Sequence, residues 1–162
     1  MIEIHPSAKV SQLADIEDSV RGSRIVVGAN SIIDSFVKVK PAGGSGDLIV
    51  GEHVVINAGC VLYTGHGINI GNHVAIAANC TFAPINHAYA ERYSLILNQG
   101  FLPSKGGITI EDDVWIGANC VLLDGAVLRQ GCVVGAGSIV RGELKPYTVY
   151  AGQPLQILGE RI

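Results

Sequence analysis

Apolar residues recur at every sixth position along most of this chain, in blocks of three consecutive units. The position after each of them is often glycine or acidic, and the position four residues later is small or β-branched. An α-helix repeats about every 3.6 residues, so a period of six would scatter these side chains around its axis. The pattern instead predicts short parallel strands joined by tight corners, with three units closing one triangular coil of a hexapeptide β-helix. The repeating apolar residues are Ile4, Val10, Ile16, Val27, Ile33, Val39, Val50, Ile56, Leu62, Ile70, Ile76, Phe82, Ile110, Ile116, Leu122, Leu128, Val134 and Val140.

The breaks in this period follow the third unit of a block. Five extra residues precede Val27 and Val50, two precede Ile70, and 22 precede Ile110. Because three units complete a coil, we expect every insertion to leave the prism at the same edge. The longest insertion predicts a protruding loop over residues 83–109.

The same repeat predicts a single all-β domain over residues 1–162, a parallel β-helix of about six triangular coils. One short helix is expected within residues 88–99 of the long loop. After Val140 the repeat fades, and an uncovered solenoid end would expose core and unpaired backbone. We therefore expect residues 146–162 to form a C-terminal cap, with a second short helix near 154–160.

Composition narrows the class of protein. Hydrophobic residues make up 48% and charged residues 15% of the chain, which excludes intrinsic disorder. The net charge of −3 and the absence of a basic run argue against nucleic acid as a partner. No apolar run approaches the roughly 18 residues of a membrane span, and the residues after Met1 do not resemble a signal peptide. A cytoplasmic protein without membrane insertion is therefore expected.

The four cysteines form no CxxC pair and are too few for a disulfide scaffold of this length. Each lies four residues after a repeating apolar residue, at Cys60, Cys80, Cys120 and Cys132. Small or β-branched residues occupy this position elsewhere in the repeat. We therefore interpret the cysteines as small buried apolar side chains rather than metal ligands or nucleophiles.

Two histidines are candidates for proton transfer, because imidazole titrates near neutral pH. His87 begins the long loop, beside Asn86, and is the leading candidate for a general base. Its alternative role is to pack against the next coil. His66 lies in Gly65-His66-Gly67 on the loop edge and is the second candidate.

The other histidines, His5, His53 and His73, fall at corner positions of the repeat and are expected to be solvated. A metal site is the alternative, because some β-helices of this kind carry zinc. It would require three histidines to converge on one point. His66 and His73 are seven residues apart, and His53 lies one coil away. The favoured interpretation includes no metal.

Trp115 is the only tryptophan and lies five residues after Ile110, a position that faces outward in this repeat. An outward tryptophan on a narrow prism indicates a groove, a ligand or a contact between subunits. The loop aromatics Tyr89, Tyr93 and Phe101 either join this surface or form a small core within the loop. No P-loop, dinucleotide-binding fingerprint or nucleophile elbow is present.

Three segments resemble those of hexapeptide acyltransferases: Val114–Asn119 (VWIGAN), Gly135–Val140 (GAGSIV) and Ala151–Pro154 (AGQP). In these motifs the chain is similar above all to the galactoside and maltose O-acetyltransferases and the polysaccharide O-acetyltransferases. The resemblance implies a left-handed β-helix that assembles as a homotrimer, with active sites between neighbouring subunits. It also implies acetyl-coenzyme A as co-substrate, lying in a groove parallel to the prism axis.

By this resemblance, His87 removes a proton from the acceptor hydroxyl, whose oxygen attacks the thioester directly without a covalent enzyme intermediate. Such a transfer needs proximity, a base within hydrogen-bond reach and a donor for the oxyanion. The candidate acceptor-binding residues are Asn86, Tyr63, His66 and Tyr89. The groups implied to contact coenzyme A are Trp115, Gly117, Ala118, Gly135 and Ala136 for the pantetheine arm, and Arg141 and Lys145 for the phosphates.

Two departures from the family pattern concern this site. Many relatives have Thr-Lys-Asp after the Gly-Ala-Gly-Ser unit, where this chain has Arg141-Gly142-Glu143. The residue after the loop histidine is often proline, and here it is Ala88.

The predicted function is an acetyl-coenzyme A-dependent O-acetyltransferase acting on a hydroxyl of a sugar or glycan precursor. An amino-sugar N-acetyltransferase is the near alternative, because a similar site can acylate an amine. A metal-dependent, carbonic anhydrase-like β-helix and a non-enzymatic scaffold are alternatives from other classes. The motifs do not specify the acceptor.

Overall fold

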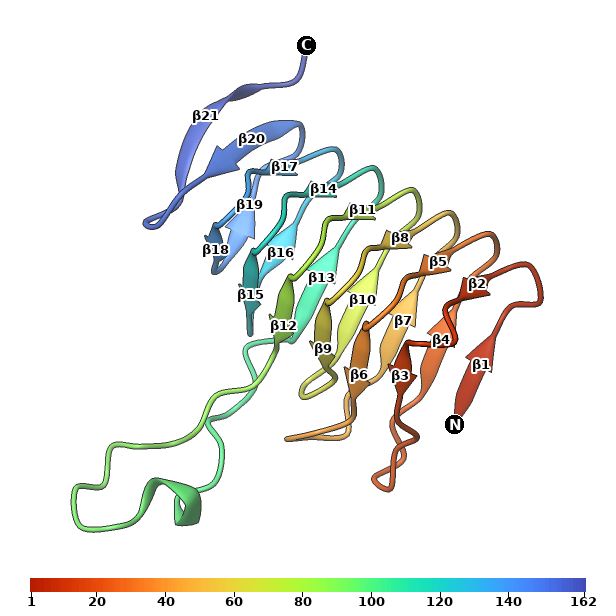
Figure 1. The fold of residues 1–162 in the computed structure, drawn as a ribbon. Helices are drawn as coiled ribbons and strands as arrows, with labels where there is room; N and C mark the ends of the chain where they lie inside the picture. The colour runs from red at the N-terminus through yellow and green to blue at the C-terminus, as the bar shows by residue number, and fades with distance from the viewer.

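Three sheets of short parallel strands wind around one axis in the computed structural model, which describes residues 1–162 (Figure 1). The first sheet contains β1 (Ile2–Ile4), β4 (Ile25–Val27), β7 (Leu48–Val50), β10 (Ile68–Ile70), β13 (Ile108–Ile110), β16 (Val127–Leu128) and β19 (Glu143–Leu144). The second contains β2 (Lys9–Val10), β5 (Ile32–Ile33), β8 (Val55–Ile56), β11 (Ala75–Ile76), β14 (Trp115–Ile116), β17 (Val133–Val134), β20 (Thr148–Ala151) and β21 (Gln156–Glu160). The third contains β3 (Asp15–Ile16), β6 (Lys38–Lys40), β9 (Val61–Tyr63), β12 (Thr81–Ala83), β15 (Val121–Leu123) and β18 (Ile139–Val140). Three consecutive strands close each coil, and the complete coils confirm the predicted parallel β-helix.

The repeating apolar residues stack in register along the prism axis. Ile56 pairs with Ile33 of the preceding coil and with Ile76 of the following one. All three belong to a core of 30 buried residues. Burying an isoleucine side chain stabilises a fold by about 1.5–3 kcal/mol, so neighbouring coils stabilise one another. The first coil departs from this pattern, because no earlier coil covers it and Ile4 is exposed.

Several corners, where the chain passes from one sheet to the next, have left-handed backbone conformations. His53 and His73 have φ angles of 55° and 57° at successive corners between the first and second sheets. Both side chains are exposed, and their rings stack with centroids 5.0 Å apart. A non-glycine residue in this conformation costs about 1–2 kcal/mol, which the paired strands on either side offset. These two histidines are therefore solvated corner residues, as predicted.

The four cysteines are buried, as predicted. Cys60, Cys80 and Cys120 stack at one corner, and each thiol donates to a carbonyl oxygen of the next coil at 3.2 Å. Burial raises the pKa of Cys132 to about 12, so this thiol stays protonated at neutral pH. The hydrogen bond with Cys80 lowers the pKa of Cys60, but that side chain is fully buried. The cysteines therefore pack the core, and burial keeps them from contacting a substrate.

The long insertions leave the prism at the edge between the third and first sheets, as predicted (Figure 1). The longest connects β12 to β13 and projects away from the coils; we call residues 84–107 the arm. It is slightly shorter than the predicted loop of residues 83–109, because the flanking strands extend into that range. The short helix expected within residues 88–99 is the 3-10 helix η1 (Ile96–Asn98). The chain contains no helix long and apolar enough to span a bilayer.

The C-terminal segment corrects the sequence prediction in two respects. The repeat continues beyond Val140, because β19 and β20 join the first and second sheets. Residues 154–160 do not form a helix, since β21 pairs antiparallel with β20 along the free edge of the second sheet. An unpaired strand edge is a template for strand pairing, and this partner decides the conformation of the tail. Leu155, between the two strands, packs against the core.

Candidate functional site

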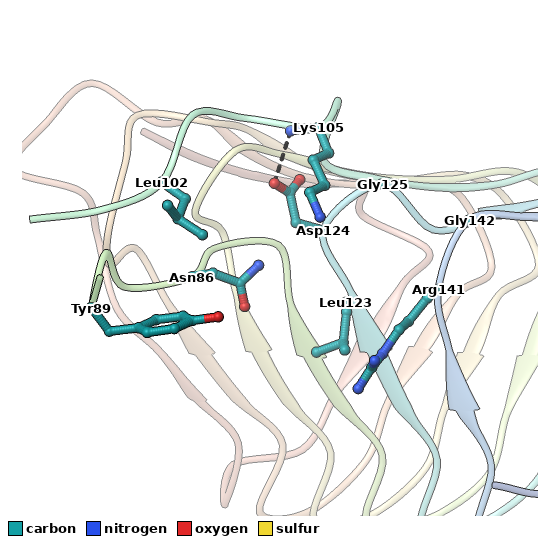
Figure 2. Close-up of a pocket in the computed structure, with 9 residues that line it drawn as sticks. All are labelled: Asn86, Tyr89, Leu102, Lys105, Leu123, Asp124, Gly125, Arg141 and Gly142. Carbon is teal, nitrogen blue, oxygen red and sulfur yellow. Dashed lines mark hydrogen bonds between the residues drawn. The ribbon is translucent and has the colours of Figure 1, made fainter. Parts of the chain in front are cut away.

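A cleft of about 550 Å³ lies at the base of the arm, beside the ends of β15 and β18 (Figure 2). The residues that line it are Asn86, Tyr89, Leu102, Lys105, Leu123, Asp124, Gly125, Arg141 and Gly142. Asn86 and Tyr89 point into it from the arm, and Arg141 enters from the opposite side (Figure 2). The cleft thus brings together two predicted acceptor-binding residues and one predicted phosphate-binding residue.

The base of the arm is a short two-stranded ribbon. His87 faces Phe101 across an antiparallel bridge, and the Leu102 N–H group donates to the Asn86 carbonyl oxygen at 2.8 Å. The rings of His87 and Phe101 lie 4.7 Å apart between centroids and are tilted by 44°. This pairing holds His87 in place although its side chain is exposed.

His87 does not line the cleft, whereas its neighbour Asn86 does. Side chains alternate between the two faces of an extended strand, so consecutive residues face opposite ways. Leu102 lines the cleft and Phe101 does not, which follows the same alternation on the other strand of the ribbon. At the bridge, therefore, Asn86 and Leu102 face the cleft and His87 and Phe101 do not. Tyr89, which lies beyond the bridge, lines the cleft again.

Asp124 anchors the returning part of the arm. Its side chain is 2% exposed and accepts hydrogen bonds from the Lys105 and Gly107 N–H groups at 2.8 and 2.9 Å. His66 Nδ1 lies 3.3 Å from the same carboxylate. These contacts compensate the burial of a charged group. Sequence reasoning missed Asp124 and Lys105, because an Asp-Gly pair after a strand indicates only a turn.

The remaining predicted acceptor-binding residues lie outside the cleft. His66 reaches the cleft wall only through Asp124. Tyr63 lies at the end of β9 and is half-buried. The four predicted acceptor residues therefore separate into a pair in the cleft, Asn86 and Tyr89, and a pair in the coils.

The predicted coenzyme A contacts lie at different places on the prism. Trp115 faces outward from the second sheet, as predicted, and is 53% exposed. The two repeat units that contain Gly117 and Gly135 pack closely on each other. A Cβ on Gly117 would lie only 2.5 Å from the Ala136 nitrogen. One chain does not gather these residues in a single groove. Gly117, Ala118, Gly135 and Ala136 lie between the second and third sheets, Arg141 lies at the loop edge, and Lys145 is exposed after β19.

The histidines of the metal alternative do not converge. His53 and His73 stack at the corner between the first and second sheets, whereas His66 lies at the loop edge beside Asp124. No three His, Cys, Asp or Glu side chains gather in an arrangement that could hold a metal ion. The zinc site considered from the sequence therefore has no geometric basis within the chain.

The triangular coils, the six-residue units and the single long arm define a left-handed parallel β-helix of the hexapeptide type. Residues 107–142 match the family model described as bacterial transferase hexapeptide (six repeats). The chain belongs to the hexapeptide-repeat acetyltransferase family.

Several curated relatives resemble the chain over much of its length. A probable acetyltransferase of Mycobacterium tuberculosis is 28% identical over 99% of this chain and 48% of its own length. The galactoside O-acetyltransferase of Escherichia coli is 30% identical over 68% of this chain and 53% of its own. The chain therefore spans about half the length of these two relatives.

Solved structures show the same fold. A mutant of AntD, an N-acyltransferase from Bacillus cereus in complex with dTDP-4-amino-4,6-dideoxyglucose and coenzyme A, superposes with a TM-score of 0.82 at 25% identity. That match covers 99% of this chain and 84% of AntD. A hexapeptide-repeat acetyltransferase of Vibrio cholerae, complexed with acetyl-coenzyme A, has a TM-score of 0.65 at 27% identity, over 83% of this chain and 69% of its own.

Proposed function

We propose that this protein transfers an acetyl group from acetyl-coenzyme A to a hydroxyl group of a sugar or glycan precursor. Membership of the family supports transfer from a thioester, and the galactoside O-acetyltransferase relative supports a sugar hydroxyl as acceptor. The observation that carries the proposal is the ribbon that holds an exposed His87 at the base of the arm. An accessible imidazole on a fixed backbone is suited to act as general base at neutral pH.

In the proposed reaction the acceptor hydroxyl attacks the thioester carbonyl. A C–O bond forms and the C–S bond breaks, the hydroxyl proton passes to His87, and the coenzyme A thiolate leaves and takes up a proton. The buried cysteines agree with a direct transfer that needs no covalent intermediate. Trp115 would form an apolar wall for the pantetheine arm, and Lys145 is a candidate for the nucleotide phosphates. Arg141, the other basic residue expected there from the sequence, instead lines the cleft beside Asn86.

A homotrimer with active sites between subunits is part of the proposal. The arm exposes large apolar side chains, among them Tyr93 at 96% and Leu97 at 83%. Exposed apolar patches of this kind mark interaction sites. A neighbouring subunit would also bring together coenzyme A contacts that lie apart in one chain. The outward residues of the second sheet form a matching apolar column: Ile32, Val55, Ala75, Trp115, Val133 and Val149.

An amino-sugar N-acetyltransferase is the second candidate. The similarity to AntD favours it, because that N-acyltransferase was crystallised with an amino-sugar nucleotide. The same general base could take a proton from an attacking amine, so the arrangement around His87 suits either acceptor.

Thiol release from acetyl-coenzyme A tests the proposal directly. The assay uses a panel of galactosides, free sugars, nucleotide sugars and amino sugars, with mass spectrometry of each product. We expect acceptor-dependent release and a product that hydroxylamine cleaves, as it cleaves an ester. An amide product that resists hydroxylamine would favour the N-acetyltransferase. No acceptor-dependent release across the panel would contradict both candidates.

A further inference from the structure

Two cations in the cleft have no anionic partner within the chain. The ion pairs of the protein involve other basic groups, and none includes Lys105 Nζ or the Arg141 guanidinium. Both side chains line the cleft, and Figure 2 shows them approaching it from the arm and from the coils. This positive charge is uncompensated although the whole chain has a net charge of −3.

The one carboxylate in the cleft wall is already engaged. Asp124 accepts hydrogen bonds from two backbone N–H groups of the arm and lies beside His66. Because its side chain is 2% exposed, it presents almost no surface to a ligand. With one enclosed carboxylate against two accessible cations, the cleft keeps a net positive charge.

The rest of the lining suits a small polar ligand with an acid group. Asn86 and Tyr89 turn an amide and a phenol hydroxyl toward the middle of the cleft (Figure 2). Leu102 and Leu123 supply an apolar wall for a carbon skeleton. A guanidinium group binds carboxylate or phosphate through two parallel N–H donors, which makes Arg141 the strongest anion-binding group here.

We propose that the cleft binds the acid group of an anionic acceptor, a sugar or glycan precursor that carries a carboxylate or a phosphate. This rests on the proposed function, because it places the acid group on the acceptor of the transfer reaction. Lys105 and Arg141 bind the oxyanion, and the reacting hydroxyl reaches His87 around the edge of the ribbon.

The phosphates of coenzyme A are the competing source of an oxyanion. The thioester must lie at His87 during transfer, and the whole pantetheine arm separates it from the nucleotide phosphates. Asn86, the residue immediately before His87 in the chain, forms part of the cleft wall. In one chain the cleft is therefore too close to the reacting carbonyl for those phosphates, and the acid group of the acceptor is the occupant that the geometry favours.

The test compares anionic and neutral sugars on wild type and four variants. Glucose 6-phosphate, glucuronic acid and glucose serve as probes, in calorimetric binding and in thiol release from acetyl-coenzyme A. Lys105→Ala and Arg141→Ala remove the two cations. Lys9→Ala and Arg21→Ala remove exposed basic residues of the N-terminal coil region and serve as matched controls. Thermal unfolding of each variant identifies any loss of fold.

We expect one or both anionic probes to bind more tightly than glucose, and the preferred probe identifies carboxylate or phosphate as the oxyanion. Loss of a charge-assisted hydrogen bond should weaken that binding about tenfold in each cleft variant. The controls and the Michaelis constant for acetyl-coenzyme A should not change. Equal binding of glucose and both anions would overturn the inference. So would cleft variants that raise only the Michaelis constant for acetyl-coenzyme A, since the cleft would then hold nucleotide phosphates.

The two proposals fail in different ways. Anion binding that depends on Lys105 and Arg141, without thiol release for any sugar, would uphold an anion-binding cleft and contradict the transferase. If the protein transfers acetyl to neutral sugars at a rate that Lys105→Ala and Arg141→Ala do not change, the proposed transferase function would be upheld. The proposal of an anionic acceptor would be contradicted.

Discussion

Phe101 is the only aromatic side chain in contact with the imidazole of His87. The two residues face each other on the ribbon, and His87 is exposed. A general base must lie within hydrogen-bond reach of the proton that it removes, so a small rotation of the ring would lower the rate. Phe101 therefore acts as a positioning residue for His87 in the proposed reaction.

Phe101→Ala should lower kcat about tenfold, which corresponds to about 1.4 kcal/mol of transition-state stabilisation. The Michaelis constant for acetyl-coenzyme A should not change, because Phe101 lies away from the outward face of Trp115. Steady-state kinetics with the best acceptor measure both constants. Phe101→Leu, which keeps an apolar side chain against the imidazole, should recover part of the rate. A Phe101→Ala variant with wild-type kcat would show that the ring contact has no positioning role.

Residues whose positions depend on the six-residue repeat could be predicted from the sequence. Position within the six-residue repeat predicts the buried cysteines, the exposed corner residues His53 and His73, and the outward Trp115. Asp124 and Lys105 could not be predicted, because their contact depends on how the arm returns to the coil. That path is set by long-range backbone hydrogen bonds, which a local pattern does not reveal.

At the scale of elements, the repeat determines where strands form and where insertions leave the prism. The ribbon at the base of the arm and the pairing of β21 with β20 are outside the repeat. Both are antiparallel pairings between segments without a six-residue period. The sequence predicts a short helix near 154–160 and gives no signal for β21, because the free edge of β20 with which β21 pairs exists only after the coils have stacked.

Gly117→Ala tests the close packing of successive coils. The added Cβ would lie 2.5 Å from the backbone nitrogen of Ala136, and backbone cannot move aside as a flexible side chain can. Overpacking of this kind typically costs about 1–3 kcal/mol. In a chain of this size each kilocalorie lowers the Tm by roughly 2–4 °C. Thermal unfolding should therefore show a drop of several degrees.

Gly159→Ala is the matched control for that substitution, because a Cβ there meets no atom within 4 Å and its φ is not positive. Its Tm should equal that of wild type. If Gly117→Ala unfolds at the wild-type temperature, the coils are not packed as closely as the structure indicates. In that case a loss of activity in Gly117→Ala would reflect coenzyme A binding alone.

For the whole molecule, the main question is what covers the arm and the apolar column of the second sheet. One chain leaves both exposed, and it also leaves His87 and the predicted coenzyme A contacts on separate surfaces. A second copy of the chain would resolve all three features at once. The homotrimer is predicted from the resemblance to the family, and the six-residue repeat alone does not indicate it.

Sedimentation velocity should give the mass of three chains for wild type. Tyr93→Ser combined with Leu97→Ser should shift the protein toward monomer, because both side chains are almost fully exposed in one chain and apolar. Leu158→Ser, an exposed apolar residue of β21, is the control and should leave the mass unchanged. A monomeric wild-type protein with full acetyltransferase activity would contradict an active site between subunits.

The rate of thiol release by His87→Ala is the most direct test of the central claim, acetyl transfer with His87 as general base. General base catalysis contributes typically 10²–10⁴-fold, so we expect the rate at saturating substrates to fall at least about a hundredfold. Coenzyme A affinity and oligomeric mass should match those of wild type. A His87→Ala variant that is assembled, binds coenzyme A and transfers acetyl within about threefold of the wild-type rate would contradict the account.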